Sequence, residues 1–213
     1  MPLQQIKEDF YDLSKNPCKK LLTRIRNCSE CIDSLPLGPR PVLNFHPESK
    51  ILLVGQAPGT KVHESGIPWD DASGKRLREW MDISEEEFYD VHNFAIVPMG
   101  YCYPGKGKSG DLPPRKECAD LWLDKILDSL KKLELVIVIG KYAQAQYIPD
   151  SKLNITEMTK EWLKYKFNNI PVVVLPHPSP RNNIWLKKNP WFEREVLPKF
   201  KVLISKLLVS RRK

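Results

Sequence analysis

Two stretches of this sequence combine polar side chains with a backbone that glycine and proline keep out of regular structure. The first is LLVGQAPGTKVHESGIPWDDASG, residues 52–74, and the second is HPSPRN, residues 177–182. The first stretch offers backbone N–H groups and carboxylates, and the second offers an imidazole beside two stiffening prolines. Together they could bind a planar polar ring and stabilise the negative charge that a leaving group carries away.

The segments around these stretches follow the pattern of an α/β domain. Short apolar runs predict four strands, and helical patterns fill most of the intervals between them. We expect strands at 51–54, 94–97, 135–139 and 172–175, and helices at 75–81, 119–132, 142–147 and 157–165. This alternation predicts a four-stranded parallel sheet flanked by helices on both faces. Since the carboxyl ends of parallel strands share one edge, the loops after the first and fourth strands should open at the same edge.

Length and composition bound the organisation of the chain. Its 213 residues fit a single domain, with two helical patterns in residues 1–27 as an N-terminal helical extension. No apolar run approaches the roughly 20 residues that a membrane span requires. The polar N-terminus also lacks the apolar core of a secretory signal. We therefore expect a cytoplasmic protein without membrane association, acting as a monomer.

The charge balance favours a polyanionic partner such as nucleic acid. The formal net charge is +8 and the pI is near 9.2. Basic residues cluster at Lys106 and Lys108, and again at Arg181, Lys187 and Lys188. For both clusters we favour a phosphate contact, with a solvated surface as the alternative. A solvated surface is the favoured interpretation of the basic tail, Arg211, Arg212 and Lys213.

The two polar stretches resemble a known pair of motifs. GQAPG followed by GIPWDDASG, and later HPSPRN, are similar to the two signature motifs of the uracil-DNA glycosylase superfamily. The resemblance extends from about Cys28 to beyond Trp191 and is closest to the iron–sulfur groups called families 4 and 5. It implies the four-stranded parallel fold and a monofunctional DNA glycosylase of base excision repair. Such an enzyme hydrolyses the N-glycosidic bond of a deaminated base, most simply uracil, after flipping it out of DNA.

The cysteine layout adds to this resemblance. Cys28 and Cys31 form a CxxC motif, and Cys102 and Cys118 lie sixteen positions apart across a proline-rich loop, as the cluster ligands do in families 4 and 5. The resemblance thus implies a [4Fe–4S] cluster held by four thiolates. Zinc suits tetrahedral sulfur ligation equally well, and four unconnected buried thiols are the third interpretation. Cys18 matches nothing in this layout and is interpreted as a packed thiol.

The resemblance also implies catalytic roles. Asp71 is the candidate for the carboxylate that stabilises positive charge on the sugar and orients water, because it precedes a Ser-Gly pair as in family 5. Its spacing from Gly66 is one residue shorter than in that family, so Asp70 is the alternative. For either carboxylate the structural interpretation is a helix N-cap. His177 would stabilise the departing base, together with loop N–H groups.

Base and DNA contacts are assigned from the same motifs. Trp69 falls where the family stacks an aromatic side chain on the flipped base, and a buried core tryptophan is the alternative interpretation. The loop residues expected to contact the base are Gln56, Ala57 and Gly59. Contacts with the DNA backbone or minor groove are expected from Ser179, Arg181 and Asn182.

Pro98 departs from the family pattern. Families 4 and 5 carry an asparagine at this position to read the Watson–Crick edge of uracil, and proline has no side-chain donor or acceptor. Base preference is therefore open. The alternatives are another deaminated base such as hypoxanthine, a broader preference, or a metal-stabilised DNA-binding module without catalytic turnover.

Overall fold

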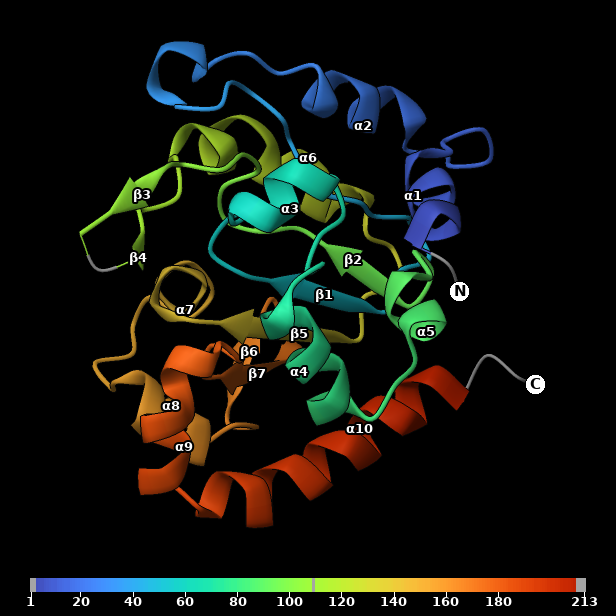
Figure 1. Ribbon diagram of the computed structural model, residues 1–213. Coiled ribbons are helices and arrows are strands. Elements are labelled where there is room, and N and C mark those ends of the chain that lie inside the picture. The colour runs from blue at the N-terminus through green and yellow to red at the C-terminus, as the bar shows by residue number, and fades with distance from the viewer. Residues whose placement is uncertain (1–2, 109, 210–213) are drawn as a thin grey trace.

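The computed structural model describes residues 3–108 and 110–209, and the basic tail at 211–213 lies outside them. A five-stranded sheet with the order β2-β1-β5-β7-β6 forms the centre of the molecule (Figure 1). Its four parallel strands are β2 (Phe94–Ile96), β1 (Ile51–Val54), β5 (Leu135–Ile139) and β7 (Ile170–Leu175). The α/β class and the four predicted parallel strands are confirmed.

A fifth strand, β6 (Tyr165–Phe167), pairs antiparallel with β7 at the edge of the sheet. The prediction of a helix over 157–165 was wrong at this end, because α8 (Ile155–Lys160) stops before the strand begins. Asn168 and Asn169 connect β6 to β7, and both have positive φ, 48° and 67°. Two left-handed residues make the tight turn that matches the twist of a hairpin, and asparagine tolerates that conformation. The hairpin therefore adds an edge strand that apolar periodicity alone did not predict.

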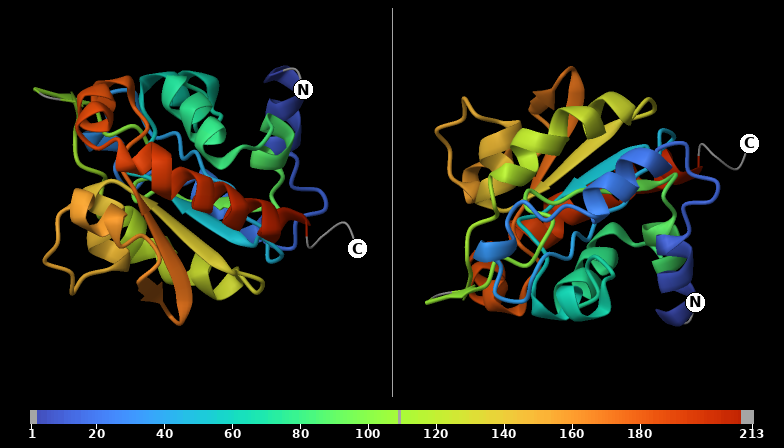
Figure 2. Two further views of the ribbon diagram at one scale, coloured as in Figure 1. Left: turned by 90° about the horizontal axis from the view of Figure 1, so that it is seen from below. Right: turned by 90° about the horizontal axis from the view of Figure 1, so that it is seen from above.

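Alternate residues of the central strands enter two separate cores. Leu52, Val136 and Val174 belong to one core, with Leu22 of α2 and Ile126 of α6. Their strand neighbours belong to the other core, with residues of α4 and α10: Ile51, Leu53, Ile137, Val173, Leu77, Trp80, Phe200 and Ile204. Side chains of a strand point alternately to opposite faces, so helices must cover both sides of the sheet. Figure 2 shows this layering, with α10 across one face and α2 and α6 across the other.

The remaining elements surround this sheet. The helices are α1 (Leu3–Tyr11), α2 (Lys19–Arg26), α3 (Thr60–Ser65), α4 (Ala72–Met81), α5 (Glu85–Tyr89), α6 (Asp124–Ser129), α7 (Lys141–Tyr147), α9 (Asn183–Lys188) and α10 (Leu197–Val209). Short 3-10 segments are η1 (Ile32–Ser34) and η3 (Pro180–Asn182), and π-helical segments are η2 (Ala119–Leu123) and η4 (Phe192–Val196). A small hairpin pairs β3 (Lys106–Gly107) with β4 (Gly110–Asp111). Among the described helices, none is both long enough and apolar enough to cross a membrane.

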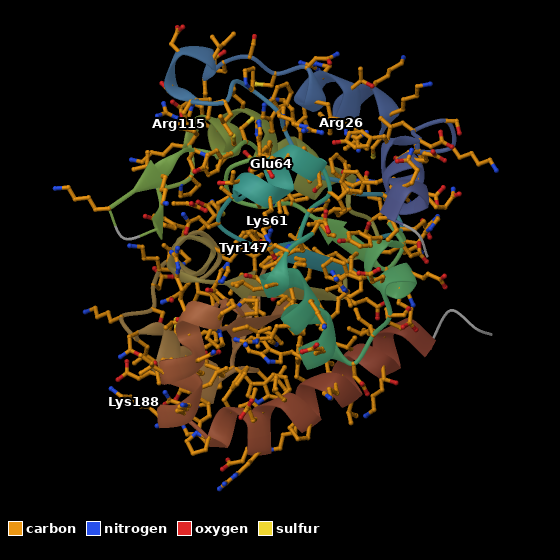
Figure 3. The ribbon with its side chains drawn as sticks, in the orientation of Figure 1. Arg26, Lys61, Glu64, Arg115, Tyr147 and Lys188 are labelled. Carbon is orange, nitrogen blue, oxygen red and sulfur yellow. The ribbon has the colours of Figure 1, made fainter. Side chains whose placement is uncertain are left out.

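The N-terminal helices pack onto the body of the protein. Leu22 and Ile25 of α2 are fully buried. Arg26, labelled in Figure 3, lies on α2. It donates to the carbonyl oxygens of Phe10 and Leu43 at 3.1 and 3.4 Å, and its guanidinium lies over the ring of Tyr11. Tyr11 in turn donates to the carbonyl oxygen of Gly66, within the first polar stretch, at 3.0 Å. The predicted extension is thus in direct contact with a loop that the sequence assigns to the functional site.

Candidate active site

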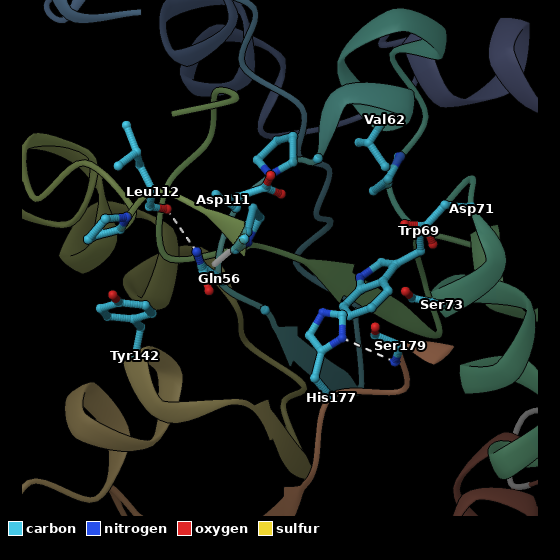
Figure 4. A pocket seen from close by; sticks show the side chains of 18 of the residues that line it. Gln56, Val62, Trp69, Asp71, Ser73, Asp111, Leu112, Tyr142, His177 and Ser179 are labelled. Atoms are coloured by element: carbon cyan, nitrogen blue, oxygen red, sulfur yellow. Dashed lines mark hydrogen bonds between the residues drawn. The ribbon is translucent and has the colours of Figure 1, made fainter. Parts of the chain in front are cut away.

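A cavity of about 730 Å³ opens at the carboxyl ends of β1 and β7 (Figure 4). Its lining includes the residues that the two polar stretches assigned to chemistry, base or DNA: Gln56, Ala57, Gly59, Trp69, Asp71, His177, Ser179, Arg181 and Asn182. Of the other basic residues favoured for phosphate contact, Lys108 lines it, whereas Lys106, Lys187 and Lys188 are not among the described lining residues. Pro98 also lines it. The two polar stretches therefore meet where parallel-strand topology predicts that they should.

His177 follows β7 and is half-buried at the edge of this cavity. Its Nδ1 accepts a hydrogen bond from the backbone N–H of Ser179 at 3.2 Å. Burial lowers the pKa of the imidazole below its ordinary value of 6.5, and the carboxylates of Asp71 and Asp111 raise it by smaller amounts. A neutral ring whose Nδ1 is an acceptor carries its proton on Nε2. In Figure 4 the nitrogen without the dashed line faces the cavity, so His177 presents a neutral N–H donor there.

Asp71 caps helix α4 and also lines the cavity. Its Oδ1 accepts from the backbone N–H of Gly74 at 2.8 Å, so the structural interpretation as an N-cap is correct. A carboxylate has two oxygens with several lone pairs, so a cap does not exhaust its capacity. Asp70 is not among the described residues that line the cavity. Geometry therefore favours Asp71 over Asp70 as the carboxylate of the site.

Trp69 has a strained backbone that its neighbours hold in place. Its φ is 59°, in the left-handed region that a bulky residue seldom adopts. A Cβ at Gly74 would lie 1.7 Å from the carbonyl oxygen of Trp69, so only glycine allows this approach. The indole is half-buried, packs partly against the core, and lies 5.8 Å from the His177 ring between centroids at an angle of 31°. One aromatic face is thus available beside the imidazole.

Arg76 of α4 joins the two polar stretches, which the sequence analysis did not foresee. Its Nη1 donates to the carbonyl oxygen of Ser179 at 3.2 Å and to Oδ1 of Asn183 at 2.8 Å. The helix that Asp71 caps is thereby tied to the loop that carries His177. Only the tertiary fold brings these positions together, so no local pattern could have revealed the contact.

The loop after His177 is held by its own side chains. Asn182 donates through Nδ2 to the carbonyl oxygen of His177 at 2.7 Å, and the hydroxyl of Ser179 accepts from the N–H of Arg181 at 3.1 Å. These bonds fix the loop conformation. Of the three residues assigned to DNA contact, Arg181 is the one classed as exposed. It is therefore the side chain best placed to reach a phosphate.

The segment between Cys102 and Cys118 forms a wall of the cavity. Asp111 and Leu112 line it, and Nε2 of Gln56 donates to the carbonyl oxygen of Leu112 at 2.8 Å. The sequence analysis assigned this segment only to cysteine ligands and a basic cluster, because strands of two residues leave no periodic signal. Other lining residues that it did not assign to the site include Ser73, Lys141 and Tyr142.

The four cysteines of the predicted metal site are all free thiols. The pKa of Cys102 is raised to about 11 and that of Cys118 to about 12, chiefly by burial and in smaller part by the charges of Cys28 and Cys31. The two segments therefore bring the thiols close enough to affect one another's ionisation. The backbone N–H of Tyr101 also donates to Sγ of Cys118 at 3.4 Å.

The donor set fits an iron–sulfur cluster by its chemistry. Within residues 3–108 and 110–209, no group of three or more His, Cys, Asp or Glu side chains has the geometry to hold a metal ion. A four-iron cluster places its own iron and sulfide atoms between its ligands, so it needs thiols further apart than one tetrahedral zinc does. Four thiols from two segments, near one another but not closed around a single ion, are compatible with the larger group.

The fold and cavity define a class: α/β proteins whose strand-end loops place an aromatic ring, an imidazole and a carboxylate in one cavity. Residues 43–201 match the sequence profile of the Uracil DNA glycosylase superfamily, and this chain belongs to that superfamily. It is 23% identical over 139 residues to the type-4 uracil-DNA glycosylase of Sulfurisphaera tokodaii, a match that spans 63% of this chain and 61% of that relative. The crystal structure of wild-type Pedobacter heparinus SMUG2 aligns with a TM-score of 0.45 at 16% identity, covering 87% of this chain and 97% of that one.

Proposed function

We propose that this protein is a monofunctional DNA glycosylase that releases a deaminated base, most simply uracil, as the first step of base excision repair. The observation that carries this proposal is the neutral N–H donor of His177 in one cavity with Asp71 and Trp69. Membership of the superfamily and the name of the type-4 relative support it.

The proposed mechanism assigns one task to each of these side chains. Trp69 stacks on the flipped base. As the C1′–N bond breaks, the bond electrons move to the base, and the Nε2–H of His177 donates to the carbonyl oxygen where negative charge develops. The carboxylate of Asp71 stabilises the oxocarbenium-like sugar and orients the water that adds to C1′. Both charges of the transition state thus meet a preorganised partner.

DNA is the proposed partner on the basis of charge and position. Arg181 is exposed at the rim of the cavity, and the chain carries a formal net charge of +8. Ile184, just beyond it on α9, is 68% exposed and offers an apolar side chain next to the loop. A phosphate contact beside an apolar wedge suits a protein that extracts a base from the stack.

We further propose that Cys28, Cys31, Cys102 and Cys118 hold a [4Fe–4S] cluster, which would tie the N-terminal segment to the 102–118 segment. Residues 1–213 would then act as one cytoplasmic domain. The packing of α2 in the core supports this unit. Visible absorbance with iron bound to the protein is the expected result, whereas a colourless zinc protein would identify the rival metal.

The test of the proposed function is release of free base by purified, anaerobically prepared protein. Single- and double-stranded oligonucleotides containing uracil or hypoxanthine are the substrates, and the abasic strand should break only after alkali treatment. His177→Ala should slow release about 100-fold or more. The matched control is His63→Ala, because His63 is not among the described residues that line the cavity. If no lesion is released, the proposal fails.

A second candidate function is DNA binding without turnover. The bond from Asp71 to Gly74 and the proline at position 98 favour it, because one occupies a carboxylate oxygen and the other removes a base-reading amide. Salt-dependent binding to lesion DNA without base release would support this candidate.

A further inference from the structure

At two positions of the cavity lining, the side chain is not free to form hydrogen bonds with the edge of a base. Pro98 lines the cavity without a side-chain donor or acceptor. The side-chain amide of Gln56 is partly occupied, because its Nε2 donates to the carbonyl oxygen of Leu112 at 2.8 Å. An enzyme that excises a damaged base must still distinguish it from the undamaged one. Another polar group of the lining must therefore contribute to that distinction.

Asp111 is the unassigned carboxylate of this cavity. It ends β4 and extends into the cavity, opposite Asp71 in the view of Figure 4. A Cβ at Gly59 would lie 3.6 Å from its Oδ2, so the carboxylate lies against the GQAPG loop. Its charge also raises the pKa of His177. Among the described residues, no side-chain hydrogen bond or ion pair occupies Asp111, in contrast to Asp71 with its bond to Gly74.

Deamination changes the base at a position that a carboxylate can read. Cytosine has a lone pair at N3 and adenine has one at N1, whereas uracil and hypoxanthine carry a hydrogen on the same ring nitrogen. A carboxylate only accepts hydrogen bonds, so it attracts the ring N–H of the deaminated base and repels the lone pair of the parent base. One acceptor can thus distinguish uracil from cytosine and hypoxanthine from adenine, whereas thymine and guanine, which also carry this ring N–H, must be excluded by other contacts.

We propose that Asp111 is a specificity-determining residue, which accepts the ring N–H of a flipped deaminated base in place of the side chain that Pro98 lacks. The inference rests on the proposed glycosylase function and names its substrate class: deaminated bases with a ring N–H beside a carbonyl group, whether pyrimidine or purine. The cavity volume of about 730 Å³ lies within the range of pockets that hold whole small ligands. Pro98 has no side-chain amide that would obstruct the larger ring of a purine.

The test removes the proposed hydrogen bond in two ways: by methylating the ring nitrogen of the base and by mutating Asp111. Single-turnover release is measured for uracil and for 3-methyluracil, in which a methyl group replaces the ring hydrogen, and for hypoxanthine and its 1-methyl derivative. Wild-type protein should release each unmethylated base about 10–100-fold faster, the factor expected for one hydrogen bond to a charged group. In Asp111→Ala the two members of each pair should be released at similar rates. Asp120→Ala is the matched control, because it removes an exposed carboxylate that is not among the described lining residues, and it should discriminate as wild type does.

The outcomes separate this inference from the function on which it rests. If the wild type releases uracil but Asp111→Ala discriminates equally well, the role of Asp111 is wrong and the glycosylase function stands. If the wild type releases cytosine as fast as uracil, the cavity does not read the ring N–H, and the inference is again wrong. If the wild type releases no base from any substrate, the proposed function itself fails.

Discussion

The base cavity and the cysteine region differ in how their functional groups are held. In the cavity, hydrogen bonds within the protein fix the key groups: His177 accepts from Ser179, Asp71 accepts from Gly74, and Arg76 ties the two loops together. In the cysteine region all the thiols are free, and the described residues there do not close around a metal ion. The cavity is preorganised by hydrogen bonds of the chain itself, whereas the cysteine region would be held together by the proposed cluster.

This difference predicts different consequences of mutation. Changes in the cavity should reduce catalysis and leave stability nearly intact, since each side chain there is held by several others. Changes in the cysteine region should reduce stability first, because metal binding free energy contributes directly to folding free energy.

Loss of one cysteine ligand should have the largest effect. Cys102→Ser should release the bound metal and lower the free energy of unfolding by about 5 kcal/mol or more, a drop of roughly 10–20 °C in Tm. Calorimetry with iron and zinc analysis measures both quantities. Cys18→Ser is the control, since this thiol lies outside the CxxC and its partner segment. Unchanged metal content and Tm in Cys102→Ser would remove the contrast between the two regions.

Asp71 allows catalysis and capping to be separated at one position. Asp71→Asn should keep the cap on α4, since asparagine caps as well as aspartate, yet slow base release about 100-fold through loss of the negative charge. Asp71→Ala should lose both, with about 1 kcal/mol of stability in addition. Single-turnover rates and thermal unfolding of the two variants provide the comparison. Equal rates in Asp71→Asn and wild type would move the catalytic carboxylate elsewhere.

Arg76 tests whether the clamp between the two loops matters for chemistry. Arg76→Met keeps much of the apolar stem but removes both bonds to the 177–183 loop, so His177 should be less well placed and kcat should fall about 10-fold. The neighbouring Lys75→Met removes an exposed charge from the same helix and serves as the control. A change confined to KM would instead indicate a role in binding DNA.

The pH dependence of base release tests the protonation state of His177. The folded protein depresses the pKa of this imidazole below 6.5, so the neutral donor persists at pH values where an ordinary histidine is half protonated. Release should therefore begin to decline only at a lower pH than it would with an ordinary histidine in this position. The free energy of unfolding changes with pH in the same direction. The contribution of neutral His177 to it is fully present above pH 6.5 and is lost as pH falls through the folded-state pKa of this side chain. His177→Asn should lack this decline in its residual activity.

Sequence reasoning worked where one local pattern determines the outcome. The apolar runs predicted β1, β5 and β7 because buried parallel strands need continuous apolar residues, and the strand-end rule placed Asp71 and His177 at one edge. It missed Arg76 and Asp111 because their neighbours come from distant parts of the chain. It also missed β6, although the Asn-Asn pair before β7 was a usable turn signal.

The order of segments along the chain has a consequence for biosynthesis. The four cysteines of the proposed metal site precede Ala119, whereas the cavity is complete only after β7 and the loop that ends at Asn182. A ribosome that adds about 5–20 residues per second needs several seconds to cover that interval. The proposed metal ligands therefore emerge while the sheet still lacks β5 and β7, so the proposed cluster could be inserted before the cavity is complete, and a nascent chain deprived of metal would leave its N-terminal segment untied during that interval.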